Sequence, residues 1–374
     1  MPVIAIFGAN ASGKSNVLKA LDYLLNFLTI GNYDNGSHLI PFKLDKQSVL
    51  SPSHFHLRTA FNGTIYTYSL ILNSARILSE KFEYALLSTR RSRLLYSRIW
   101  NEENKKFDWK NGSDFSGSHI QLEKSLKERE SFINIFCKLE VEVVEPFARW
   151  LGLSRLGSYC GHQDFDGRII NLLWGEQFSN TQSADLLPEV IESSKNLLLK
   201  FDTGLYDIEI KKIEDNENGY QVYALHKIED TKIISWKFEE ESMGTQKLFN
   251  LACRIQLMFL LNSLVIADEL GSNIHPNITY EIVKLFQNPE TNPNQTQLIF
   301  TSHDNTLQRN NLLRRDQIWF TQKRPDQSTE LYSLSDFKVR NDLAIDKAYL
   351  DGRFGAVPFI SDENDLMLVG EDNG

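Results

Sequence analysis

Residues 8–15, which read GANASGKS, constrain the fold of this chain more than any other stretch. They match the pattern G-x-x-x-x-G-K-[ST], whose glycines let successive backbone N–H groups turn toward a phosphate. The apolar run 3–7 before the loop is rich in β-formers, and residues 15–28 after it carry apolar side chains at helical spacing. A strand, a loop and a helix in this order bring the positive end of the helix to the anion, so the sequence predicts a phosphate-binding site here.

Each part of the loop has its own task in that prediction. Gly8 and Gly13 allow the backbone to turn inward. Lys14 brings a positive charge to the β- and γ-phosphates of a nucleotide, and the hydroxyl of Ser15 is placed to ligate Mg²⁺. The agreement of strand, loop and helix argues against a chance glycine-rich turn.

A second apolar run, 264–267, ends in the adjacent carboxylates of Asp268 and Glu269, which is the Walker B pattern. Two acids at a strand end are costly to bury without a cation, so by themselves they would indicate a surface turn. Together with the loop they predict that Asp268 completes the Mg²⁺ shell, directly or through water. Glu269 is then placed to polarise the attacking water as general base.

Two weaker motifs lie on either side of this run. Residues 241–247, ESMGTQK, lead into a helical stretch, where Ser242 and Gly244 can offer a hydroxyl and N–H groups to an anion. A serine at a helix start is equally an ordinary N-cap. Residues 297–304, QLIFTSHD, contain another apolar run that ends near His303, whose imidazole can hydrogen-bond the γ-phosphate and orient the water.

The composition is that of an ordinary globular protein, with 41% hydrophobic and 24% charged residues. No apolar stretch approaches the roughly 20 residues that span a bilayer, and no secretory signal stands at the start, so no membrane partner is expected. Cys137, Cys160 and Cys253 are scattered, which indicates reduced thiols in a cytoplasmic protein. The net charge of −9 argues against DNA coating by the whole surface and leaves room for a local basic groove that binds DNA.

The chain divides into three predicted parts. Residues 1–110 hold the loop, a polar connection at 30–54 and an antiparallel β meander from 55 to 110. Residues 111–200 are mostly helical and too irregular for a long coiled coil, so they predict a compact helical insertion. Residues 201–374 begin with three strand-like pieces and continue into the remaining motifs.

A basic cluster of Arg90, Arg91 and Arg93 interrupts the predicted meander. One interpretation is a contact with nucleic-acid phosphates. The simpler one is a solvated hairpin tip between two strands.

Taken together, the motifs resemble an ABC-type ATPase head of the SMC and RecF kind. The resemblance rests on GANASGKS, on ESMGTQK in place of the transporter-type signature, on LVIADEL and on FTSHD. Further segments resemble the AAA-class ATPases of bacterial abortive-infection and phage-defence loci, of the RloA/AbiL type: KFDTGLYDIEI, LLRRDQIWFTQK, TELYSLSDFKVR and AYLDGRFGAVPFI. The expected fold class is therefore α/β, a P-loop NTPase with an ABC-type head that carries the β meander and the helical insertion.

The resemblance implies an Mg²⁺-dependent ATPase that works as a homodimer or higher oligomer. In such heads two ATP molecules lie between two protomers, and each is held by the loop of one protomer and covered by the signature of the other. Glu269 and His303 then act on the closed site. The ATP-binding residues implied are Gly8, Asn10, Gly13, Lys14, Ser15, Asn16, Ser242 and Gly244. In the defence systems the ATPase commonly controls a separate effector, often nuclease-like.

Three features depart from the pattern of these families. The signature reads Ser-Met-Gly rather than Ser-Gly-Gly. The glutamine that usually senses the γ-phosphate has no clear counterpart, since Gln47 is a poor candidate. The loop begins only seven residues into the sequence, although such heads have earlier strands, one of which supports the adenine. Either the start of the chain is truncated or the head lacks those strands.

The leading functional hypothesis is an ATP-hydrolysing switch that senses phage infection and controls an effector. The alternative is a RecF/SMC-like ATPase of DNA maintenance or repair that clamps DNA. The absence of long coiled arms argues against a cohesin-like form of this alternative and not against a RecF-like one. A transporter's nucleotide subunit is disfavoured by the meander, the helical insertion and the unusual signature.

Overall fold

The computed structural model describes most of the chain. The described residues are 2–30, 39–115, 122, 126–137, 141–159, 187–201, 203–213, 220–229, 232–309, 312–340 and 343–358. Cys160, one of the three predicted reduced thiols, lies outside them.

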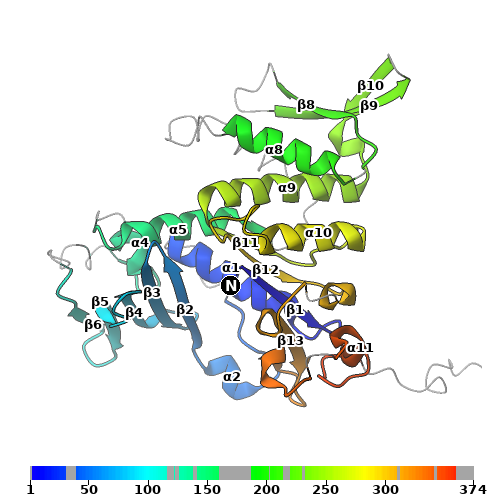
Figure 1. The fold of residues 1–374 in the computed structure, drawn as a ribbon. Helices are drawn as coiled ribbons and strands as arrows, with labels where there is room; N and C mark the ends of the chain where they lie inside the picture. Colours follow the sequence, from blue (N-terminus) through cyan, green and yellow to red (C-terminus); the bar gives the residue numbers. More distant parts are fainter. Residues whose placement is uncertain are drawn as a thin grey trace, which may run out of the picture.

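A mixed six-stranded sheet forms the centre of the fold (Figure 1), with the strand order β14-β13-β1-β12-β11-β7. Its strands are β1 (Val3–Gly8), β7 (Ser158–Tyr159), β11 (Leu264–Ala267), β12 (Gln297–Thr301), β13 (Ile318–Lys323) and β14 (Thr329–Ser333). β1 runs parallel to β12 and β13, β11 runs parallel to β12 and β7, and β14 pairs antiparallel with β13. The predicted strands before the loop, before Asp268 and before His303 are therefore confirmed.

Helices cover both faces of this sheet. α1 (Lys14–Ile30) and α5 (Glu145–Leu156) pack against each other on one face, and α9 (Met243–Leu261) and α10 (Pro276–Gln287) lie on the other (Figure 1). This arrangement of helices on both faces of a largely parallel sheet confirms the predicted α/β class.

The apolar run of β1 is buried on both sides. Val3, Ala5 and Phe7 belong to the core beneath α9 and α10, whereas Ile6 belongs to the core that contains α1. Successive side chains of a strand point to opposite faces, so a central strand needs apolar residues at every position. The sequence of β1 is for this reason continuous in hydrophobicity rather than alternating.

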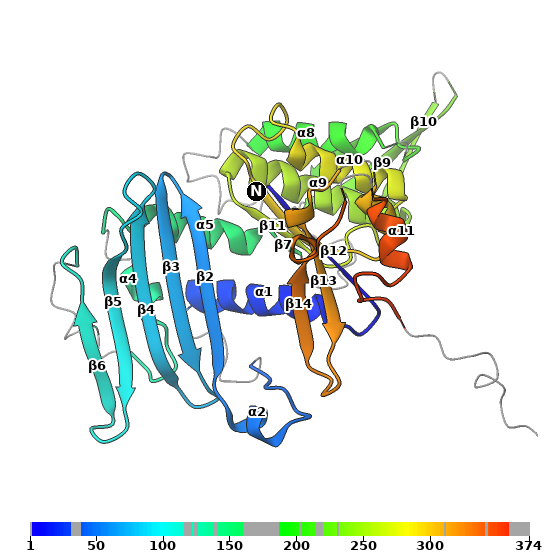
Figure 2. The same ribbon diagram turned by 60° about the horizontal axis from the view of Figure 1, so that its bottom comes forward.

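The predicted meander is a five-stranded antiparallel sheet that stands beside α1 (Figure 2). Its strands, in spatial and sequence order, are β2 (Ser53–Phe61), β3 (Thr64–Leu72), β4 (Ile77–Leu86), β5 (Arg93–Asn101) and β6 (Lys106–Asn111). The fully buried side chains of Glu80 and Arg98 form an ion pair of 2.6 Å across β4 and β5. Glu80 also accepts a hydrogen bond from the backbone N–H of Phe132, which begins the short helix α4 (Phe132–Phe136).

The structure adds detail to the predicted connection at 30–54 and to the predicted basic cluster of Arg90, Arg91 and Arg93. The connection at 30–54 contains a short helix, α2 (Lys46–Leu50), because Asp45 accepts hydrogen bonds from two N–H groups at its start. Gln47 is exposed in this helix.

Arg90 lies exposed at the turn between β4 and β5, and Arg93 forms an ion pair of 3.8 Å with Asp114. The geometry of the basic cluster is thus that of a hairpin tip.

The three predicted strands before residue 240 form a second antiparallel sheet of β8 (Asp207–Lys212), β9 (Tyr220–Glu229) and β10 (Lys232–Lys237). This sheet and α8 (Leu187–Leu199) lie beyond α9, on the side away from the central sheet (Figure 1). Within the described residues, the remaining elements are the 3-10 turns η2 (Phe238–Glu240), η3 (Asn305–Gln308), η4 (Arg315–Gln317) and η5 (Leu334–Asp336), and the helix α11 (Ile345–Leu350). Among the described residues, no helix has the length and apolar character to cross a membrane.

Candidate functional site

Three segments of the predicted site meet at one edge of the central sheet. Gly8 ends β1, Asp268 follows β11 and Ser302 follows β12. Because these strands are parallel, their carboxyl ends lie at the same edge, which is where open α/β sheets bind ligands. The strand order places the residues after β12 between the loop and the two carboxylates.

The loop 8–15 is held against the hairpin β13–β14. Gly13 has φ +105°, and a Cβ there would lie 2.2 Å from Thr329 Oγ1, so the position admits only glycine. Thr329 Oγ1 donates a hydrogen bond of 3.0 Å to the carbonyl of Ser12. The hydroxyls of Ser12 and Thr321 lie 2.6 Å apart. These contacts fix the turn that the sequence predicted.

Lys14 is buried within the loop, where the residue is 6% exposed. Its ammonium donates hydrogen bonds to the carbonyls of Gly8 and Ala9, at 2.9 and 3.0 Å. Burial lowers the pKa of this ammonium, while the carboxylates of Glu269 and Asp268 act on the pKa in the opposite direction. A cation in so dry a loop attracts a phosphate more strongly than it would in water.

Asp268 is the meeting point of the loop and two strands. Its Oδ1 accepts a hydrogen bond of 3.1 Å from Ser15 Oγ and one of 2.6 Å from Thr301 Oγ1. The hydroxyl of Thr301 in turn accepts a hydrogen bond of 2.7 Å from the N–H of Glu269. The side chain of Thr301 is fully buried, so this network is rigid.

The donors around Ser15 suit a magnesium ion. Two oxygens that occupy neighbouring octahedral positions at about 2.1 Å from Mg²⁺ lie about 3.0 Å apart. Ser15 Oγ and Asp268 Oδ1 are 3.1 Å apart, so both can join one coordination shell with almost no movement. Hydroxyl and carboxylate oxygens are also the hard ligands that Mg²⁺ prefers.

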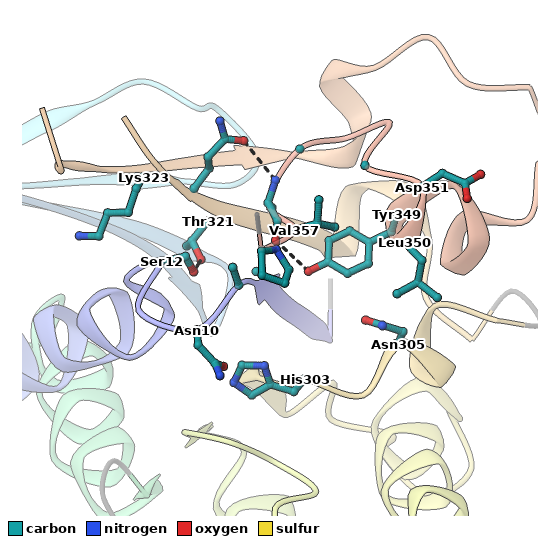
Figure 3. A pocket seen from close by; sticks show the side chains of 17 residues that line it. Asn10, Ser12, His303, Asn305, Thr321, Lys323, Tyr349, Leu350, Asp351 and Val357 are labelled. Carbon is teal, nitrogen blue, oxygen red and sulfur yellow. Dashed lines mark hydrogen bonds between the residues drawn. The ribbon is translucent and has the colours of Figure 1, made fainter. Parts of the chain in front are cut away.

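Asn10 and His303 point into a cavity of about 970 Å³ beside the loop (Figure 3). Opposite the loop, the cavity is lined by the C-terminal residues 349–352 and 355–358. Burial and the nearby Lys14 lower the pKa of His303, and Glu269 and Asp268 oppose that shift. This shift favours the neutral imidazole, in which one ring nitrogen donates a hydrogen bond and the other accepts one.

The signature residues lie at the start of α9. Ser242 is exposed, and its hydroxyl caps the helix by accepting a hydrogen bond of 3.1 Å from the N–H of Thr245. Gly244 approaches the next loop closely, because a Cβ on it would lie 2.5 Å from the carbonyl oxygen of Asn273. Within the described part of the chain, neither Ser242 nor Gly244 lines the cavity that holds Asn10 and His303. Asn16 is exposed on the first turn of α1.

Several residues of the site did not come from sequence reasoning. Thr301 stands inside FTSHD, two residues before His303, and a hydroxyl at the end of a strand beside the Walker B run was a usable signal. Thr321 and Thr329 support the loop from a hairpin more than 300 positions away in the sequence. For example, 309 positions separate Ser12 from Thr321, whose hydroxyls are hydrogen-bonded. Nothing in their local sequence indicates this contact.

Comparison with known proteins gives a match to a family model. The family described as "AAA domain, putative AbiEii toxin, Type IV TA system" matches residues 3–309. No curated protein matches the chain.

Solved structures that resemble the chain include three SMC heads. One is an SMC head bound to the C-winged helix domain of ScpA, with 12% identity, a TM-score of 0.41 and coverage of 89% of this chain and 90% of that chain. Another is an SMC head domain with an extended coiled coil bound to the C-terminal domain of ScpA, derived from Pyrococcus furiosus, with 12% identity, a TM-score of 0.41 and coverage of 94% and 93%. The third, an SMC head with a coiled coil and joint from Pyrococcus yayanosii, has 13% identity, a TM-score of 0.35 and coverage of 63% and 41%.

The family match spans the loop, the Walker B carboxylates and His303, and it covers well over half of the chain. The finer RloA/AbiL subtype stays a prediction. On the family match, the chain belongs to this AbiEii-type family of AAA domains.

Proposed function

We propose that this chain binds and hydrolyses ATP at the carboxyl edge of its central sheet. The observation that carries the proposal is the approach of Ser15 Oγ to Asp268 Oδ1, at 3.1 Å, beside the buried ammonium of Lys14. These groups would hold Mg²⁺ and the β- and γ-phosphates together. Bound Mg²⁺ would neutralise charge on the phosphates and so favour attack by water.

Two further residues complete the proposed hydrolytic site. Glu269 accepts the proton of the attacking water, as general base. His303 donates or accepts a hydrogen bond at the γ-phosphate end, where Asn10 also faces the cavity (Figure 3). The nucleoside end is proposed to lie against the wall formed by residues 349–352 and 355–358, which includes the apolar side chains of Leu350 and Val357.

The site is proposed to close only when two copies meet. Ser242 and Met243 are exposed at the start of α9, and Met243 is 61% exposed. A helix start with an exposed serine suits contact with a phosphate that another molecule holds. In the proposed dimer Ser242 and Gly244 of each protomer therefore cover the nucleotide of the other, and hydrolysis separates the pair.

We further propose that this ATP-driven switch works in anti-phage defence by abortive infection and controls a separate, nuclease-like effector. Two observations support this role: the family description names an AbiEii toxin of a Type IV TA system, and the segments around 201–210 and 312–360 resemble phage-defence ATPases.

Two assays test this proposal: phage plating on cells that express the chain, and ATP hydrolysis by the purified chain. Cells that express the chain with the product of the neighbouring gene should restrict phage, and Lys14→Ala or Glu269→Gln should abolish restriction. The purified chain should hydrolyse ATP only when Mg²⁺ is present. Strong stimulation of the ATPase by plain duplex DNA, with no restriction of phage, would instead favour the DNA-repair alternative. A pull-down with the Glu269→Gln form would identify the effector.

A further inference from the structure

Glu269 stands in an uncommon backbone conformation that its neighbours hold in place. Its φ is +51°, in the left-handed region, which is unfavourable for a residue with a Cβ. Its N–H donates to Thr301 Oγ1 at 2.7 Å, and its carbonyl accepts from the N–H of Ser272 at 3.0 Å. The same carbonyl accepts a third hydrogen bond, of 3.1 Å, from the ammonium of Lys247. The backbone at Glu269 is therefore fixed from three directions.

Lys247 reaches this carbonyl from α9, the helix that begins at the signature. Its side chain is partly buried, and burial lowers the pKa of its ammonium, while the carboxylates of Glu269 and Asp268 act in the opposite direction. A charged donor in a partly dry site makes a stronger hydrogen bond than a neutral one. Lys247 is thus the side chain that ties α9 to the Walker B end.

A second contact joins the same two segments. Gly244 packs so closely on Asn273 that a Cβ would lie 2.5 Å from the carbonyl oxygen of Asn273. The first turns of α9 consequently touch the loop 269–273 at both of its ends. Lys247 lies five residues after Ser242, which is about 7.5 Å along the helix axis. A shift of the helix start therefore moves the group that holds Glu269.

We propose that Lys247 is a positioning residue for hydrolysis: it sets the place of Glu269 and couples it to the start of α9 in the same protomer. The inference rests on the proposed function, in which that helix start covers the partner's nucleotide. Occupancy of one site would then adjust the general base of the other. Lys247 itself touches neither the nucleotide nor the water in this proposal.

The test compares three variants of the full chain. Lys247→Met keeps the length of the side chain and removes the hydrogen-bond donor. Lys247→Arg keeps a donor. The control is Lys19→Met, which makes the same substitution on the exposed side of α1. Single-turnover hydrolysis should fall about 100-fold in Lys247→Met, the loss that a small misplacement of a catalytic group produces. The Kd for a fluorescent ATP analogue should change little. Lys247→Arg should recover most of the rate, and Lys19→Met should match the wild type.

Amide hydrogen exchange supplies a readout that does not depend on hydrolysis. Peptides that cover residues 268–274 should exchange faster in Lys247→Met than in wild type and return toward wild type in Lys247→Arg. Unchanged exchange or an unchanged rate in Lys247→Met overturns the proposal. An equal loss of ATP binding, hydrolysis and melting temperature also overturns it, since that pattern indicates general structural support. If the wild type binds no ATP, the proposed function fails, and the exchange data still decide whether Lys247 holds Glu269.

Discussion

Ser15 and Asp268 are in hydrogen-bond contact, with Oγ and Oδ1 3.1 Å apart, although 253 positions separate them in the sequence. The contact exists because β1 and β11 are parallel strands of one sheet with β12 between them. Thr301, at the end of β12, donates to the same carboxylate oxygen at 2.6 Å.

Lys14→Ala should remove nucleotide binding. The ammonium is buried in the loop, and no water can replace its charge at the phosphates. We expect the Kd for Mg²⁺-ATP, measured by titration calorimetry, to rise at least about 100-fold, the effect of losing roughly 3 kcal/mol of charge-assisted hydrogen bonding. The matched control is Lys19→Ala, on the exposed face of the same helix, which should bind ATP as wild type does.

Glu269→Gln should leave ATP bound but unhydrolysed. The amide is the same size as the carboxylate, so the hydrogen bonds of the Glu269 backbone to Thr301 and Lys247 persist, while the base is lost. The rate constant for hydrolysis should fall about 10²–10⁴-fold, the usual contribution of general acid–base catalysis. Sedimentation in Mg²⁺-ATP should show a stable dimer for this variant. Hydrolysis at the wild-type rate would show that another group acts as the base.

Thr301→Val should weaken the metal site without changing the shape of the core. Valine fills the same volume but leaves the N–H of Glu269 without its partner, at a cost of about 1–3 kcal/mol. It also frees Asp268 to turn away from Ser15. The concentration of Mg²⁺ that gives half-maximal ATPase rate should therefore rise, and the melting temperature should fall. Ser302→Ala, at the next position, is the control, because its hydroxyl donates to the carbonyl of Leu270 and not to Asp268.

Features of the fold that depend on neighbouring residues could be predicted from the sequence, whereas those that depend on contacts between distant residues could not. Strands before Gly8, Asp268 and His303 could be predicted, because each is a continuous apolar run that leads into a residue of a recognisable motif. The meander could be predicted from alternation in β2 and β3 and from the turn at Asn62-Gly63. Such patterns lie within a few neighbouring residues, so they can be recognised without knowledge of the fold.

The supporting contacts of the site could not be predicted in the same way. Thr329 touches Gly13 only because the hairpin β13–β14 pairs beside β1, and no local pattern encodes that register. The C-terminal residues 349–358 reach the cavity through hydrogen bonds such as the one that Ala356 N–H donates to Gln322. The hydroxyl of Ser242 illustrates the opposite case, since the sequence allows both an N-cap and an anion site, and the structure shows the cap.

Val357→Asp should weaken the binding of ATP more than the binding of inorganic tripolyphosphate. Val357 lines the cavity opposite the loop, where the proposed nucleoside end lies, whereas tripolyphosphate engages only the loop. We expect the ratio of the two Kd values to shift by about tenfold toward tripolyphosphate, from about 1.4 kcal/mol of lost apolar contact. An unchanged ratio would place the nucleoside elsewhere. Lys14→Ala should weaken both ligands alike.

Glu80→Ala should destabilise the five-stranded sheet and leave the nucleotide site chemically unchanged. The side chains of Glu80 and Arg98 are both fully buried, so the substitution leaves an uncompensated guanidinium in the core. Removal of one partner from such a pair typically costs about 3–5 kcal/mol. Thermal unfolding followed by circular dichroism should therefore show a clear fall in melting temperature, while the exposed Glu102→Ala, which loses a surface pair with Lys105, should unfold as wild type does.

The free energy of unfolding should depend on pH through the carboxylate of Glu80. Burial by itself raises the pKa of Glu80, but Arg98 and the hydroxyls of Tyr96 and Tyr68 outweigh burial and lower the pKa below its ordinary value. A lowered pKa in the folded state means that Glu80 contributes stability above the pKa of the unfolded chain, and that this stability disappears as the pH falls through the folded value. Between pH 7 and pH 3 the free energy of unfolding should consequently fall more steeply for the wild type than for Glu80→Gln, measured by urea titration at each pH. Equal slopes would show that Glu80 takes up no extra proton on unfolding, and the ion pair with Arg98 would then contribute nothing to the pH dependence of stability.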